Sequence, residues 1–249
     1  MKWVRNIAVY LPLLVIWEFV VRVRLVSAQI LPAPSDVLKA IYALAASGEL
    51  FRDAALSLFR VSAGFAFAAM LGMVLGVVTA EVRFARTILT PLVEILRPVP
   101  PAAYVGIAVM WWGLGNGPSI FLVTYGSFFP IYTLTALGIM SVNPLHRDAS
   151  RCLGASHWLM LTDIVIPTAL PQILAGLKTG LGVAWFCVIV AELIAQGGLG
   201  YLIQLNRLML RTDNVVAGIV VVGIMGYSMQ LGMDLLTRRL VRWHQPQRQ

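Results

Sequence analysis

The sequence predicts an all-α integral membrane protein with six transmembrane helices. Hydrophobic residues make up 59% of the 249 residues and charged residues only 12%, which is too apolar for a soluble domain. Apolar stretches of about 20 residues recur along the chain, and this is the length that an α-helix needs to cross a bilayer. Lipid requires every backbone group to find an internal partner, and no regular ten-residue alternation is present. A helical bundle is therefore favoured over a β-barrel.

The first apolar run is expected to stay in the protein as a membrane helix. Glu18 interrupts it, and Arg22 and Arg24 follow at positions where a signal peptide is uncharged. In the second span, Gly72 and Gly76 are four residues apart, so a neighbouring helix can approach closely. We expect a single transmembrane domain over residues 1–249, with spans at about 7–23, 54–80, 88–112, 119–140, 170–195 and 214–236.

Between the fourth and fifth spans, residues 146–173 form a polar segment. It holds Arg147, Asp148, Arg151, His157 and Asp163. Gly154 can take the left-handed conformation that ends a helix, so the segment is expected to form two short helices joined there. Pro167 and Pro171 are expected to close the second helix and restart the chain as a membrane helix. From composition alone the segment is either a surface for a partner or an interfacial anchor.

Charge sets the expected orientation. Six spans place both termini on one side, and the short loops and tail on that side hold more Lys and Arg than the opposite side, which indicates cytoplasmic termini and a cytoplasmic polar segment. The net charge of +8 is explained by this bias without nucleic acid as a partner. The basic residues on the termini side are Lys2, Arg5, Arg83, Arg86, Arg147, Arg151, Arg238, Arg239, Arg242 and Arg248. Those on the opposite side are Arg22, Arg24, Lys39, Arg52, Arg207 and Arg211.

No catalytic or metal site is apparent in the sequence. A P-loop requires a lysine directly after a glycine, and none of the three lysines meets this condition. The three histidines lie outside the expected spans, and the two cysteines indicate neither a disulfide framework nor a metal site. We expect no catalytic residue, metal or cofactor in this chain, and any ATP hydrolysis belongs to another chain.

A few polar residues inside the spans are candidates for a translocation path. Arg97 lies roughly 13 Å into the third span at 1.5 Å per residue, a depth at which a charge faces the bundle interior or a water-filled path. It either carries an anion or forms an internal ion pair with Glu94, three residues earlier. Pro98 and Pro100 are expected to break the helix where it lines a cavity.

Three further polar residues belong to the expected spans. Glu192, in the fifth span, either acts in gating or makes a structural hydrogen bond. Arg60 and Lys178 are expected to extend to the membrane surface.

The spacing within the polar segment resembles the EAA loop of binding-protein-dependent ABC importers. Asp148-Ala149-Ser150 is followed by Gly154, Ile164 and Pro167 at the distances of Glu-Ala-Ala, Gly and Ile-x-Leu-Pro. Asp148 replaces the glutamate with a shorter arm, and Ser150 replaces the second alanine. Other stretches resemble the nitrate, taurine and aliphatic-sulfonate branch: LPAP from Leu31, LSLFRVSAGF from Leu56, EILRPVPP from Glu94, WWGLGNGPSIF from Trp111, AELI from Ala191 and GGLGYL from Gly197.

The resemblance implies a type I importer permease with a MetI-like bundle in the bacterial cytoplasmic (inner) membrane. Two cytoplasmic ABC ATPases that use ATP and Mg would bind the coupling loop, residues 141–169, and an extracytoplasmic solute-binding protein would deliver the solute. A second copy of the chain would complete a homodimeric pore. The solute would be a small anion, taurine or an alkanesulfonate above all. A secondary transporter without an ATPase remains the alternative, although its internal repeats are not evident. The implied coupling residues are Asp148, Ala149, Ser150, Gly154, Ala155, Ile164 and Pro167.

Overall fold

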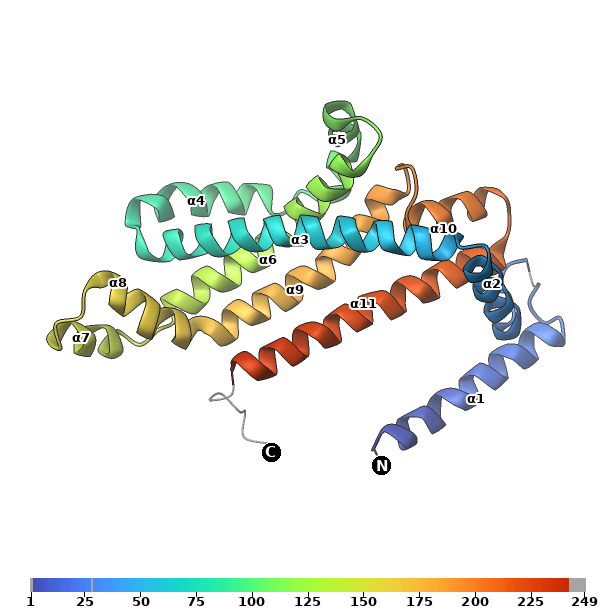
Figure 1. The fold of residues 1–249 in the computed structure, drawn as a ribbon, viewed down its shortest axis with the longest axis horizontal. Helices are drawn as coiled ribbons and strands as arrows, with labels where there is room; N and C mark the ends of the chain where they lie inside the picture. The colour runs from blue at the N-terminus through green and yellow to red at the C-terminus, as the bar shows by residue number, and fades with distance from the viewer. Residues whose placement is uncertain (1, 28, 242–249) are drawn as a thin grey trace. The chain divides into compact units, whose positions relative to one another are not determined.

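The computed structural model describes residues 2–27 and 29–241, with side chains from residue 11 onward, and this part of the chain has helices and loops but no strand (Figure 1). Arg242 and Arg248, used above to orient the chain, lie outside the described residues. The elements are α1 (Lys2–Arg22), α2 (Pro34–Ala46), α3 (Glu49–Glu81), α4 (Arg83–Leu96), the 3₁₀ turn η1 (Pro101–Tyr104), α5 (Val105–Trp112), α6 (Asn116–Met140), α7 (Pro144–Cys152), α8 (His157–Met160), the π turn η2 (Leu161–Val165), α9 (Ile166–Glu192), α10 (Leu199–Leu208) and α11 (Thr212–Leu240).

The described residues divide into two compact units. The first runs from 2 to 58 and from 192 to 225. In it, Glu18 of α1 accepts hydrogen bonds from the Ser35 backbone N–H (3.1 Å) and the Ser35 hydroxyl (2.8 Å) at the start of α2. Arg22 lies 2.9 Å from the same carboxylate. The charge that interrupts the first apolar run therefore joins α1 to α2.

The second unit, residues 59–191 and 226–241, packs α3 and α9 against α6 through glycines. A Cβ on Gly72 would lie 2.9 Å from Cγ2 of Ile131, and one on Gly76 would lie 2.8 Å from Cβ of Thr135. On α9, a Cβ on Gly180 would lie 2.7 Å from Cγ1 of Ile131. The close approach predicted from the glycine pair is confirmed, and α6 is the neighbour.

Among the residues that the structure describes, four helices are long and apolar enough to cross a membrane, and one bent pair makes a fifth candidate. They are α3, α6, the continuous helix 157–192 and α11, which correspond to the expected spans 54–80, 119–140, 170–195 and 214–236. The first expected span, 7–23, forms helix α1, and its crossing of the membrane stays a prediction.

The expected third span, 88–112, is not one straight helix. Helix α4 and the segment from Pro101 to Trp112 meet at 85°. The prolines between 98 and 101 lack backbone donors, so the helix cannot continue through them. At the break, the Leu96 carbonyl accepts from the Val99 N–H at 3.1 Å and from the Tyr125 hydroxyl of α6 at 2.7 Å. The predicted break is confirmed, and it is sharp.

The expectation that Pro167 and Pro171 end a helix is wrong. The chain is helical without a break from His157 to Glu192. A π turn at Leu161–Val165 widens the helix just before Pro167, and the Ile166 N–H donates to the Leu161 carbonyl five residues back. Met160, Leu161 and Val165 are buried with Ile139 of α6 in one apolar cluster, which holds the turn in place. Tertiary packing thus carries the helix across its prolines.

The glycine contacts give a first prediction. We expect Gly72→Ala to lower the melting temperature of the purified protein in detergent, because overpacking a helix contact costs about 1–3 kcal/mol. Gly232→Ala is the matched control, since a Cβ there meets nothing within 4 Å. Its replacement should leave the melting temperature unchanged or slightly raised. Equal melting temperatures for the two variants would contradict the packing described.

Candidate functional site

The polar segment is built on a helix that is capped at both ends. At the start of α7, the Asn143 side chain accepts from the Leu145 N–H at 2.9 Å and Pro144 occupies the first turn. At the end, Gly154 has φ +80° and donates to the Arg151 carbonyl at 3.0 Å, while the Ala155 N–H donates to the Ser150 carbonyl at 3.0 Å. These two bonds close a helix through a left-handed residue. The predicted role of Gly154 in ending this helix is confirmed.

The residues implied in coupling separate into an exposed and an inward-facing set. Asp148, Ala149 and Gly154 are exposed, whereas Ser150 is buried and donates its hydroxyl to the Arg147 carbonyl at 2.8 Å. Three residues, all of them only partly buried, complete the inward-facing set: Ala155, Ile164 and Pro167.

Large apolar side chains surround the exposed set and were missed by sequence reasoning. Leu153 is 88% exposed and Trp158 72% exposed, and Leu145 is exposed as well. Exposed apolar side chains that gather in this way indicate a surface that a protein partner or a membrane covers.

An ion pair that the sequence did not indicate fixes these helices to the membrane spans. Arg147 Nη1 lies 2.8 Å from Glu81 at the end of α3, and its Nη2 donates to the Ile139 carbonyl of α6 at 3.0 Å. His157 Nε2 lies 3.9 Å from the second Glu81 oxygen. Figure 1 shows α7 and α8 beyond the end of α6, where α9 begins. The loop helices are thus joined to the ends of two spans at once.

Glu94 and Arg97 line a cavity of about 220 Å³ between α3, α4 and α6. Its other lining residues include Thr79, Thr90 and Tyr132. In the part of the chain that the structure describes, neither charged side chain takes part in an ion pair, so the internal Glu94–Arg97 pair is not formed here. Pro98 and Pro100 lie in the bend that follows and do not line this cavity.

Glu192 lies in a buried network of the first unit. Its two carboxylate oxygens are 2.8 and 2.7 Å from the Ser57 hydroxyl, and it accepts from the Gly200 N–H at 3.0 Å. Ser57 accepts from the Leu199 N–H at 2.9 Å, and Asp53 accepts from the Gly198 N–H at 3.0 Å. Three successive N–H groups at the start of α10 are therefore satisfied by side chains, as the structural interpretation of Glu192 expects.

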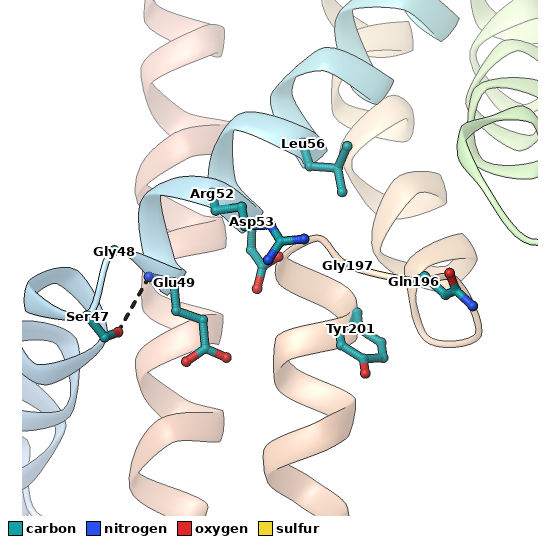
Figure 2. Close-up of a pocket in the computed structure, with 9 residues that line it drawn as sticks. All are labelled: Ser47, Gly48, Glu49, Arg52, Asp53, Leu56, Gln196, Gly197 and Tyr201. Carbon is teal, nitrogen blue, oxygen red and sulfur yellow. Dashed lines mark hydrogen bonds between the residues drawn. The ribbon is translucent and has the colours of Figure 1, made fainter.

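Beside this network lies an open cavity of about 870 Å³ (Figure 2). Figure 2 shows Glu49, Arg52 and Asp53 on the first turns of α3, with Gln196 and Tyr201 on the opposite wall. No sequence motif indicated it.

Two basic residues expected at the membrane surface have other surroundings. Arg60 is 1% exposed, and its Nε donates to the Asn116 side chain at 2.9 Å. Lys178 of α9 lies 2.6 Å from Asp234 of α11. The expectation that Arg60 extends to the surface is wrong, because the residue is buried and held by a partner on another helix. The position of Lys178 relative to the membrane surface stays a prediction.

Comparisons with known proteins agree along the chain. The family model described as "Binding-protein-dependent transport system inner membrane component" matches residues 68–243. The taurine transport system permease protein TauC of Escherichia coli (strain K12) is 37% identical over 238 residues, covering 93% of this chain and 86% of that protein. The putative aliphatic sulfonates transport permease protein SsuC of the same strain is 34% identical and covers 98% of this chain and 94% of the relative.

Two solved transporters share the fold. The inward-facing MetNI methionine ABC transporter matches with a TM-score of 0.68 at 19% identity, over 77% of this chain and 96% of that chain. A bacterial alginate ABC transporter in complex with a pentasaccharide-bound periplasmic protein matches with a TM-score of 0.62 at 18% identity, over 96% of this chain and 95% of that chain.

The buried network generates a prediction about Gly198, which has φ +105° and whose added Cβ would overlap the Glu192 carboxylate. Gly198→Ala should lower the free energy of unfolding by the left-handed penalty of about 1–2 kcal/mol plus about 1–3 kcal/mol for the overlap. Gly48→Ala, at φ +78° with nothing within 4 Å, carries only the first cost. Thermal melting of both variants in detergent checks this, and a Gly198 variant no less stable than the Gly48 variant would contradict it.

Proposed function

Because this chain belongs to the family of inner membrane components of binding-protein-dependent transport systems, we propose that it forms the pore of an ATP-driven importer for taurine or an alkanesulfonate. The chain is a multi-pass inner-membrane transport subunit, not an enzyme, and its partners include an ATPase and a solute-binding protein. The named sulfonate relatives support this solute class. Nitrate is the next candidate, because the nitrate import permease protein NrtB of Synechocystis sp. is 28% identical.

In the assembly proposed here, two copies of this chain enclose the path, two cytoplasmic ATPases bind ATP and Mg, and one binding protein delivers the solute. The chain itself needs no cofactor. Both termini and the loop helices lie in the cytoplasm. This orientation rests on the distribution of Lys and Arg in the sequence.

Helix α7 carries the coupling part of the proposal, because it is capped at both ends, exposed, and surrounded by uncovered apolar side chains. Asp148, Ala149 and Gly154 form the polar and backbone part of this surface, and Leu153 and Trp158 supply apolar area that an ATPase cleft can bury. Ser150, Ala155, Ile164 and Pro167 support the surface from within.

The ion pair between Arg147 and Glu81 gives that surface a mechanical connection. Only 9% of the Glu81 side chain and 21% of the Arg147 side chain are exposed, so water screens this pair less than a surface pair. When ATP binding moves the ATPase cleft, α7 moves with it, and the ends of α3 and α6 follow. The bundle then shifts between two arrangements, one open to each side.

Arg97 is the candidate that meets the solute in the membrane. Its guanidinium can form paired hydrogen bonds with a sulfonate, and the cavity of about 220 Å³ beside it offers threonine and tyrosine hydroxyls. Glu94 shares this cavity, and Pro98 and Pro100 keep the following backbone irregular. Glu192 belongs instead to the support of α10.

The function is tested by purifying the tagged protein from its native membrane in mild detergent and identifying what comes with it by mass spectrometry. We expect a stoichiometric P-loop ATPase, and ATP-dependent uptake of radiolabelled taurine or alkanesulfonate once the complex and its binding protein are in liposomes. A protein that purifies alone even after cross-linking would contradict the importer and favour a secondary transporter.

For the coupling surface, we expect Gly154→Arg to abolish copurification of the ATPase while the protein still inserts in the membrane, since a bulky charge would occupy the contact. Gly48→Arg is the control, because Gly48 has a similar φ and open surroundings but lies far from α7 in sequence. ATPase yields that are the same for both variants would remove α7 from the interface.

For the path, Arg97→Gln should reduce solute uptake at least about tenfold, equivalent to about 1.4 kcal/mol, with the complex still assembled. Arg83→Gln removes an exposed charge from the first turn of the same helix and should leave uptake unchanged. Unchanged uptake in the Arg97 variant would return this residue to a structural role.

A further inference from the structure

Two membrane helices of the second unit are joined by an ion pair for which neither the motif nor the proposed path accounts. Lys178 Nζ of α9 lies 2.6 Å from Asp234 Oδ1 of α11. The Gln230 side chain, one turn before Asp234, donates from Nε2 to the Lys178 carbonyl at 3.4 Å. Within the described residues, the Gln230 Oε1 atom is buried without a hydrogen-bond partner. One cation, one anion and one free neutral acceptor are therefore gathered together.

By the span bounds expected from the sequence, the pair lies within a membrane-spanning segment, and it remains open on one side. Lys178 is eight residues inside the expected span 170–195, roughly 12 Å at 1.5 Å per residue. Even so, its side chain is 44% exposed and that of Asp234 is 37% exposed in the single chain. Charged groups at such a depth face a bundle interior or water and not lipid. In an importer built from two membrane subunits, the open side therefore faces the second subunit and the path between them.

The charges match one class of solute. A sulfonate alone would attract the Lys178 ammonium and leave the Asp234 carboxylate without its partner, which is costly in a partly desolvated site. A zwitterion that carries both a sulfonate and an ammonium can replace each partner with an equivalent one, so both protein charges stay paired. The Gln230 Oε1 atom is buried in the closed site, and once the ion pair opens it becomes a further acceptor for the solute ammonium.

We propose that Lys178 and Asp234 form a binding site on the cytoplasmic half of the solute path for a zwitterionic aminosulfonate. Lys178 binds the sulfonate, and Asp234 with Gln230 binds the ammonium. This inference rests on the proposed import function and deepens it, because it distinguishes aminosulfonates from alkanesulfonates that lack an amine. Without solute, the two side chains hold each other and close the site.

The test measures solute binding to the permease–ATPase complex in nanodiscs without binding protein, by equilibrium dialysis of radiolabelled taurine and of ethanesulfonate. We expect the wild-type complex to prefer taurine about tenfold. Asp234→Asn should reduce taurine binding to the level of ethanesulfonate and leave ethanesulfonate nearly unchanged, and Lys178→Gln should lose both. Asp213→Asn, at the opposite end of α11, is the control and should bind as wild type does.

A purely structural ion pair is distinguished by the double variant Lys178→Gln/Asp234→Asn. It can keep a hydrogen bond between the helices and leaves no charge unpaired, so a structural role predicts intact taurine binding, whereas the binding site predicts its loss. Lys178→Arg keeps both the pair and the site and should retain binding, which shows that the complex tolerates substitution there.

Two outcomes overturn the inference: no taurine binding by the wild-type complex, or taurine binding that the double variant retains. Uptake by the wild-type importer with its binding protein separates this failure from that of the proposed function. If the wild-type importer takes up sulfonate but the variants bind taurine as the wild type does, only the proposed Lys178–Asp234 site is contradicted. If the wild-type importer takes up no sulfonate, the proposed function itself is contradicted.

Discussion

The cost of leaving a polar group unpaired away from water governs much of this structure. Where the prolines after α4 break the helix, the Tyr125 hydroxyl and the Val99 N–H both donate to the Leu96 carbonyl. The start of α10 is buried, and its first N–H groups donate to side chains of Asp53, Ser57 and Glu192. Asp53 and Ser57 come from a helix more than 140 residues away in sequence, so the need to pair polar groups also helps determine which helices meet.

The sequence was informative where a property is local. Hydropathy located most of the spans, the glycine pair predicted a close helix contact, and Gly154 predicted the end of α7. The spacing around Asp148 indicated the family, which the comparisons confirm. The residues expected to serve coupling and the path stay predictions.

Sequence reasoning failed where distant residues decide the outcome. Pro167 resembles a helix end, but the buried cluster around Val165 and a π turn carry the helix past it. Arg147 and Glu81 are separated by an entire hairpin of spans, and Lys178 and Asp234 lie on consecutive spans with the short helix α10 between them. A single sequence gives no signal for such pairs, since their partners become neighbours only after the helices pack.

The unbroken helix from His157 to Glu192 has a consequence for how force travels. At 1.5 Å per residue its 36 residues form a rod of roughly 54 Å, which begins beside the loop helices and ends at Glu192. A rod without a hinge acts as a lever, so a displacement of about 3 Å at one end corresponds to a tilt of only about 3°. A small change in the tilt of this helix can thus transmit a displacement across the thickness of a bilayer. The π turn is the place where the helix is most easily bent.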